Sequence, residues 1–145
     1  MAPSYAVCGL GLQCNVALAA LSGLPAPARV DVRVTLGALP ADAVEASRAP
    51  DYFVDEDVDQ HGVPFMTVAR VAGGRYYRVA YGEGVTAIVD ARGSAVWATW
   101  SGAMTVDDAS SYLTGSLLGF VLRLRGVACM HGSAIAVDGK AIALV

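Results

Sequence analysis

The amino-acid sequence predicts an α+β fold in which an antiparallel β meander is followed by one long helix and then by a β-hairpin. Strand-like runs separated by short, glycine-containing connectors occupy residues 64–71, 75–81, 85–90 and 95–100. Such short connectors join antiparallel neighbours, because parallel strands need a long crossover. A helical pattern follows from residue 105, and two apolar runs joined by Asp138-Gly139 come after it.

The N-terminal part predicts one strand and one short helix before the meander. Residues 4–12 contain strand-forming side chains and are expected to form the first strand. Gly9 and Gly11 interrupt this run, and glycine inside a strand indicates a bulge or the close approach of another backbone. Asn15 is a candidate N-cap for a helical turn over residues 15–21.

A strictly alternating run over residues 30–36 predicts a half-buried strand. The side chains expected on its apolar face are those of Val30, Val32, Val34 and Leu36. The pattern is then lost over residues 37–63, where prolines and aspartates are frequent. We expect this to be the least ordered region, with a short helix over residues 41–47.

One long helix is predicted to begin after Thr105 and to end at Gly126. Thr105 can accept a hydrogen bond from the first turn, and the aspartates that follow suit the positive end of a helix. The apolar stripe at helical spacing consists of Leu113, Leu117, Phe120, Val121 and Leu124. Gly115 and Gly119 lie four residues apart on a neighbouring face, where we expect them to let the helix approach a strand or a second helix closely.

Size and composition predict a protein without a membrane span. The 145 residues carry a net charge of −3, and 55% of them are hydrophobic. The most apolar helical segment, residues 113–124, has about twelve residues, whereas a membrane-spanning helix needs roughly twenty. The N-terminus lacks the basic region of a signal peptide. A cytoplasmic location is therefore predicted.

Charge and cysteine distribution exclude further classes of function. The 10 basic residues are scattered along the sequence, which argues against a nucleic-acid-binding surface. Cys8, Cys14 and Cys129 are odd in number and lack C-x-x-C spacing, so they indicate neither a disulfide framework nor a zinc site. We interpret them as reduced, buried thiols.

An acidic run is the only cluster of candidate metal ligands in the sequence. It consists of Asp51, Asp55, Glu56, Asp57 and Asp59. Hard cations bind carboxylate oxygens, but the spacing of an EF-hand loop is not kept, because Gln60 and Met66 stand where glycine and glutamate are required. A solvated acidic loop is the favoured interpretation and a weak cation site the alternative. His61, beside this run, is predicted to be an exposed loop residue.

Motifs for catalysis and phosphate binding are missing from the sequence. No G-x-S-x-G elbow or P-loop occurs, and Gly9-Leu10-Gly11 lacks the third glycine of a dinucleotide-binding loop. No catalytic, cofactor-binding or metal-ligating residue is therefore predicted in this chain. His131 remains as a candidate, either as an ordinary strand-end histidine or as a polar group near a phosphate or substrate.

The segment of residues 125–145, RGVACMHGSAIAVDGKAIALV, resembles the entry to the catalytic domain of the HPr kinase/phosphorylase-related serine kinases. In that family a helix ends in an R-G turn, and a strand then begins with a histidine and a small residue. A D-G or similar hairpin follows, and the next apolar strand runs into a P-loop. Here His131 and Asp138-Gly139 carry the resemblance, and residues 1–124 are compatible with the small N-terminal region of the shorter members.

The resemblance implies two domains and a kinase activity of the parent protein. Residues 1–126 would form an accessory α+β domain, and residues 127–145 the first hairpin of a P-loop kinase core that stops before its P-loop. The parent would use ATP and Mg²⁺ to phosphorylate a serine of a protein or peptide, with His131 facing the phosphate site. Lys140 cannot be the P-loop lysine, because it is expected in the hairpin turn before the strand instead of in a loop after it.

This chain alone is therefore expected to hold no cofactor and to be inactive. The alternative is a stand-alone, non-catalytic binding or scaffold module for a peptide or protein partner. Self-association through the C-terminal strand is also expected, because an apolar strand edge presents unpaired backbone N–H and C=O groups.

Overall fold

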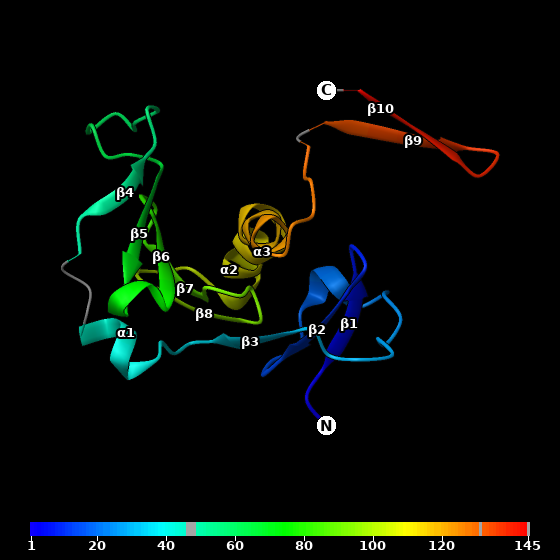
Figure 1. Cartoon of the computed structure of the whole chain (residues 1–145), viewed down its shortest axis with the longest axis horizontal. Coiled ribbons are helices and arrows are strands. Elements are labelled where there is room, and N and C mark those ends of the chain that lie inside the picture. Colours follow the sequence, from blue (N-terminus) through cyan, green and yellow to red (C-terminus); the bar gives the residue numbers. More distant parts are fainter. Residues whose placement is uncertain (46–48, 131, 145) are drawn as a thin grey trace.

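Eight strands form one mixed sheet in the computed structural model, which describes residues 1–45, 49–130 and 132–144 (Figure 1). Its strands are β1 (Ser4–Val7), β2 (Leu10–Cys14), β3 (Val32–Leu36), β4 (Asp51–Val54), β5 (Met66–Val71), β6 (Tyr76–Tyr81), β7 (Val85–Asp90) and β8 (Ala95–Trp100). Their order across the sheet is β1-β2-β3-β8-β7-β6-β5-β4. The α+β class predicted from the sequence is confirmed.

The meander is confirmed and is longer than predicted, because β4 adds a strand to its outer edge. Strands β4 to β8 pair antiparallel in chain order. The mixed part of the sheet was not predicted: β3 pairs in parallel with both β2 and β8. The meander is thereby continued by β3, β2 and β1 on the far side of β8.

The expected single strand over residues 4–12 is wrong, since the chain reverses within it. Cys8 and Gly9 both have positive φ angles, 49° and 77°, and join β1 to β2 as a two-residue hairpin turn. The predicted close approach of a backbone is correct for Gly11. A Cβ atom placed on Gly11 would lie 1.8 Å from the carbonyl oxygen of Arg29, so only glycine fits there.

Asn15 extends the sheet instead of capping a helix. Its side-chain amide donates to the carbonyl oxygen of Leu36 at 2.9 Å and accepts from the amide of the same residue at 2.9 Å. The side chain thus acts as one more residue paired with β3. The helix predicted over residues 15–21 is reduced to a single 3-10 turn, η1 (Ala19–Leu21), which has no side-chain cap.

The region of residues 37–63 holds more structure than the sequence indicates. The predicted helix over residues 41–47 is present as α1 (Ala41–Glu45), and its last two residues lie outside the described part of the chain. β4 was missed because it has only four residues, all of them exposed, so no burial pattern marks it in the sequence.

The long helix spans residues 106 to 124 as α2 (Val106–Tyr112), η3 (Leu113–Leu117) and α3 (Leu118–Leu124), with a kink at Gly115. The predicted N-cap is confirmed. The Thr105 hydroxyl accepts from the amide of Asp108, and the Asp108 carboxylate accepts from the amide of Thr105, which forms a capping box. These bonds lower the pKa of Asp108. η3 is a π-helical turn that the sequence did not predict.

The main core lies between this helix and one face of the sheet. Leu113, Leu117 and Val121 of the predicted stripe are buried, together with Leu118 and Leu122, which the stripe did not include. The other two predicted stripe residues, Phe120 and Leu124, are only partly buried. The buried stripe is therefore rotated toward Leu118 and Leu122, and Phe120 lies at its margin.

A second, smaller core covers the opposite face of the sheet near β5 and β7. Ala43 of α1 packs there with Ala69, Val71 and Ile88. Tyr76 and Trp97 flank this cluster with ring centroids 5.9 Å apart in an edge-to-face arrangement. Both faces of the central strands are therefore covered.

The C-terminal hairpin forms a separate two-stranded sheet of β9 (Ser133–Val137) and β10 (Lys140–Leu144). Asp138 and Gly139 have φ angles of 48° and 73°, which confirms the predicted D-G turn. Lys140 is the first residue of β10 and not a turn residue as expected. The hairpin projects away from the rest of the molecule, and every residue described in its strands is exposed (Figure 1).

Two expectations drawn from composition can be compared with the structure. None of the helices in the described residues is long and apolar enough to cross a membrane. All three cysteines are free thiols, and Cys14 is buried as predicted. Cys8 is exposed in the β1–β2 turn and Cys129 is half-buried, so the prediction of buried thiols is wrong for Cys8.

Replacement of Gly11 by alanine is expected to destabilise the protein by about 1–3 kcal/mol, the usual range for overpacking a well-packed site. The added methyl group would overlap the backbone of Arg29 and the Pro27 side chain. Urea unfolding at equilibrium measures this change. Gly23→Ala is the matched control, because a Cβ atom at Gly23 meets nothing within 4 Å, and equal midpoints for the two variants would contradict the prediction.

Candidate functional site

The candidate residue His131 lies outside the described residues, so the structure does not test its predicted role. The residues before it, Cys129 and Met130, belong to the linker that leads from the helix to the hairpin. The other histidine, His61, lies in an exposed loop as predicted.

Two carboxylates of the acidic run, those of Asp55 and Asp59, hold the loop itself, and a third, that of Asp51, pairs with Arg78 of β6. Asp59 accepts from the amides of His61 at 2.8 Å and Val63 at 2.9 Å, and Asp55 accepts from the amide of Asp57 at 3.1 Å. In the described part of the chain, no group of three or more histidine, cysteine, aspartate or glutamate residues is placed to hold a metal ion. The arrangement fits a solvated loop shaped by turns of its own aspartates.

An apolar groove lies between the long helix and strands β4 to β6. It comprises two adjoining cavities of about 600 Å³ and 460 Å³, which share Met66, Phe120 and Arg123. The first is also lined by Tyr81, Gly115, Ser116, Gly119, Cys129 and Met130. The second is also lined by Tyr52, Phe53, Val68 and Tyr77. We refer to these two cavities together as the helix groove.

Gly115 and Gly119 open onto the helix groove, so the expectation that they bring the helix close to another element is wrong. A Cβ atom on either glycine would meet nothing within 4 Å. Gly115 lies within the π-helical turn and has φ −93° and ψ −108°, outside the helical range. Such turns occur frequently at functional sites. At these two positions helix backbone, and no side chain, borders the groove.

Aromatic side chains form much of the groove and order one another. Tyr77 and Phe120 are edge-to-face, with ring centroids 5.3 Å apart. The hydroxyl groups of Tyr81 and Ser116 are hydrogen-bonded at 2.6 Å, which ties β6 to the π-helical turn. Burial raises the pKa of Tyr81, and the hydrogen bond with Ser116 acts in the opposite direction. Tyr112, which stacks at a tilt against Tyr81, donates to the Glu83 carboxylate.

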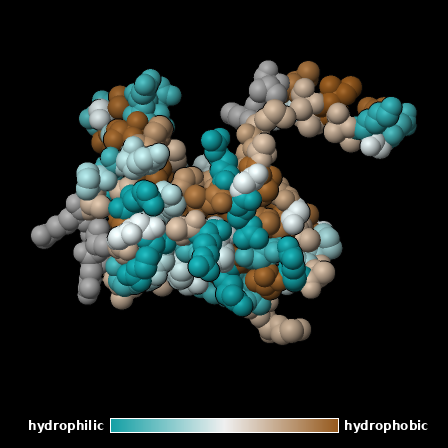
Figure 2. Space-filling view, in the orientation of Figure 1, coloured by the Kyte–Doolittle hydropathy of each residue, from teal (hydrophilic) through white to brown (hydrophobic). Residues whose placement is uncertain are grey.

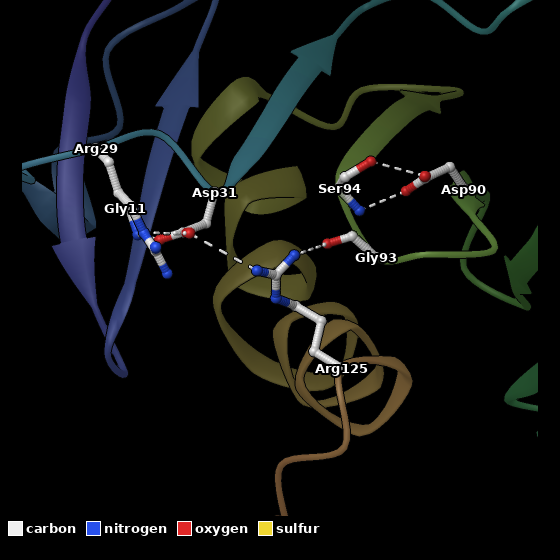
Figure 3. A network of polar contacts seen from close by, with 7 residues as sticks. All are labelled: Gly11, Arg29, Asp31, Asp90, Gly93, Ser94 and Arg125. Carbon is white, nitrogen blue, oxygen red and sulfur yellow. Dashed lines mark hydrogen bonds and ion pairs between the residues drawn. The ribbon is translucent and has the colours of Figure 1, made fainter.

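A polar network at the other end of the sheet holds the C-terminal end of the helix (Figure 3). The carboxylate of Asp31, with 8% of its side chain exposed, accepts from the amide of Gly11 at 2.8 Å and pairs with Arg29 at 2.8 Å. Arg125, directly after the helix, approaches Asp31 at 3.7 Å and donates to the carbonyl oxygen of Gly93 at 3.2 Å. The start of the linker is thereby attached to β2, β3 and the β7–β8 turn.

This network lowers the pKa of Asp31. The hydrogen bond from the Gly11 amide is the largest cause, and the charges of Arg29 and Arg125 act in the same direction against partial desolvation. A carboxylate with a lowered pKa stabilises the fold above its unfolded-state pKa of about 3.9, and this stabilisation is lost as the pH falls through the folded-state value.

The hairpin is the second feature that calls for a functional explanation. Figure 2 shows hydrophobic residues gathered along it, away from the rest of the surface. The large aliphatic side chains Ile135, Val137, Ile142 and Leu144 are 58%, 57%, 56% and 62% exposed. A stable protein seldom leaves such a cluster uncovered, because burial of apolar area is the main favourable term in folding.

Comparison with known proteins gives no further assignment. No family model, curated protein or solved structure matches the chain. The chemistry of the helix groove and of the hairpin must therefore be argued from their own residues.

The sequence pointed to the hairpin but not to the helix groove. A groove depends on which apolar residues remain uncovered after packing, and a linear pattern does not contain that information. One signal was available: Gly115, Gly119 and Arg123 recur at four-residue spacing and therefore share one helix face. A helix face of two glycines and one arginine is poor as a core face, and this could have indicated a solvent-filled recess.

The variant Asp31→Asn is expected to lower the melting temperature at pH 7, because the amide loses its charge interactions with Arg29 and Arg125. The difference in melting temperature between the variant and the wild type should shrink as the pH falls below about 4 and through the lowered folded-state pKa of Asp31. The wild-type carboxylate then becomes protonated and, like the asparagine amide, carries no charge. Thermal unfolding followed by circular dichroism over this range measures both effects. Glu56→Gln, in the exposed acidic loop, is the charge-matched control, and a difference for Asp31→Asn that does not change with pH would refute the account.

Proposed function

We propose that this chain is the N-terminal region of an ATP-dependent, HPr-kinase-like protein or peptide serine kinase, and that it is inactive alone. The observation that carries the proposal is the exposed apolar hairpin of β9 and β10. The resemblance of residues 125–145 to the entry of that kinase core gives the hairpin a specific place. The resemblance and the exposure of the hairpin concern the same residues but are separate arguments, because the first is a sequence pattern and the second is a structural observation.

The two faces of the hairpin support a position inside a larger sheet. In the register of the pair, Ile135 lies opposite Ile142, and the large aliphatic side chains share one face with Lys140. The other face carries only alanines: Ala134, Ala136, Ala141 and Ala143. Strands that are apolar on both faces are typical of sheets covered by helices on both sides, such as the core of a P-loop protein.

An isolated two-stranded hairpin is only marginally stable in water. β10 pairs with β9 alone, and its other edge has no strand partner among the described residues. In the proposed kinase, further strands would pair with this edge and helices would cover the two faces. We therefore assign residues 1–126 to an accessory domain and residues 127–145 to the first hairpin of the P-loop core.

The proposal also assigns the chemistry to the parent protein. In P-loop phosphoryl transfer, backbone amides and a lysine of the loop hold the phosphates, and Mg²⁺ neutralises the developing charge. ATP and Mg²⁺ would be the parent's cofactors, and a serine of a protein or peptide its acceptor. Lys140 is the first residue of β10, so it would lie at the start of the strand that leads to the loop and not in the loop itself. His131 is the one residue of this chain proposed to face the phosphate site.

A stand-alone binding or scaffold module is the second candidate function. The observation that favours it is the helix groove, which would offer a peptide or protein an apolar surface without any need for a kinase core. It leaves the exposed hairpin without a role. For that reason the kinase interpretation accounts for more of the molecule.

The purified 145-residue chain is expected to show no ATP turnover and no tight binding of Mg²⁺-ATP, because it contains no P-loop. Isothermal titration calorimetry and a coupled ATPase assay measure these two properties. A polypeptide that continues into the coding sequence after Val145 should gain both, and that sequence should contain a glycine-rich loop ending in Gly-Lys-Ser or Gly-Lys-Thr. ATP turnover by the 145-residue chain, or a coding sequence after Val145 without such a loop, would refute the proposal.

Self-association through β10 is expected at high protein concentration, since its edge and its aliphatic face are both uncovered. Ile142→Lys should weaken this association at least about tenfold, because a buried aliphatic contact of the order of 1.5 kcal/mol or more would be lost. Sedimentation velocity over a concentration series measures it. Val44→Lys, an exposed position on α1, is the matched control. A wild-type chain that remains monomeric throughout would rule the prediction out.

A further inference from the structure

We propose that the helix groove binds an amphipathic organic carboxylate, with its apolar body against Met66 and Phe120 and its carboxylate at Arg123. This site is independent of the kinase proposal, since it requires no P-loop. Three observations lead to this class of ligand: the size and lining of the groove, its single charge, and the space left by two glycines.

The size and lining of the groove fit an organic molecule. Small-molecule sites have volumes of about 300–1,000 Å³ and are lined mainly by apolar and aromatic side chains with few polar groups. The two cavities of about 600 Å³ and 460 Å³ lie within this range and adjoin at Met66, Phe120 and Arg123. An elongated apolar body can therefore extend from the glycine side of the groove toward Phe53.

The charge of the groove favours an anion. Among the described residues that line the two cavities, Arg123 is the only charged one, and no aspartate or glutamate accompanies it. Arg29, Arg75, Arg78 and Arg125 all form ion pairs with aspartates. No ion pair joins Arg123 to an acidic side chain of the described chain. Because a guanidinium group binds a carboxylate through two parallel hydrogen bonds, Arg123 is suited to an anionic head group.

The space beside Arg123 comes from Gly115 and Gly119. Glycine is unfavourable in a helix interior compared with alanine, yet two glycines stand one turn apart on this face. A larger residue at either position would project into the groove and exclude a ligand. The Cys129 thiol is within 3.7 Å of the Gly119 carbonyl oxygen, so the linker also borders this space. A bound ligand would thus contact both the helix and the linker to the hairpin.

Dodecanoate is a suitable probe, and dodecanol is its uncharged counterpart. Isothermal titration calorimetry below the micelle concentration should show saturable binding of one dodecanoate per chain. Arg123→Met should weaken dodecanoate binding about five- to tenfold, as expected for a lost charge-assisted hydrogen bond at a partly open site, and leave dodecanol binding unchanged. Arg92→Met is the matched control, because Arg92 lies in the β7–β8 turn outside the groove.

Gly119→Leu provides a second test that does not depend on charge. The leucine side chain should fill the groove and reduce the affinity for both probes at least about tenfold, while the unfolding midpoint stays at or above that of the wild type. Absence of saturable binding, or equal affinity of the wild type and Arg123→Met for dodecanoate, would overturn the proposal. Occupation of the groove by a second copy of the chain would also overturn it. That outcome would be seen as a dimer that the Gly119→Leu substitution dissociates and the addition of dodecanoate does not.

Discussion

One helix has to cover one face of an eight-stranded sheet, and this mismatch determines much of the molecule. A helix is about 10 Å wide, whereas eight strands spaced about 4.8 Å apart span more than 30 Å. On the side of β1 to β3, Leu18 and Leu21 from the segment around η1 fill the remaining space and are buried. On the side of β4 to β6 nothing in the described chain does so. The helix groove is the part of the apolar face that remains.

The hairpin also has apolar surface that nothing in the described chain covers. Both of its faces are apolar, and both are exposed. Its link to the body begins at Arg125, which is held by the network around Asp31 (Figure 3). The end of the helix is therefore fixed while the hairpin extends outward. A protein arranged in this way is suited to hold a second structural unit at a defined point. This arrangement supports the proposed place of the hairpin in a larger structural unit, whereas the proposal that this unit is a kinase rests on the resemblance.

Local features of the fold could be predicted from the sequence, whereas features that depend on distant partners could not. The bounds of β7 and β8, the Thr105 cap and the Asp138-Gly139 turn are encoded by adjacent residues, and all agree with the structure. The parallel pairing of β3 depends on segments far apart in the chain, and β4 has no pattern of its own. The Gly115 and Gly119 pair fits close packing and open space equally well in a sequence. Whether the two glycines are packed or open depends on the position of the neighbouring strands. The existence of the helix groove depends on those strands as well.

Hydrogen–deuterium exchange of the hairpin amides tests the central claim most directly. If β9 and β10 are the first strands of an unfinished core, their amides should exchange within seconds in the 145-residue chain, while those of β6 to β8 remain protected for far longer. The hairpin amides should become protected in a polypeptide that continues beyond Val145. Hairpin protection in the 145-residue chain equal to that of β6 to β8 would contradict the account, because it would show that the hairpin is stable without a further partner.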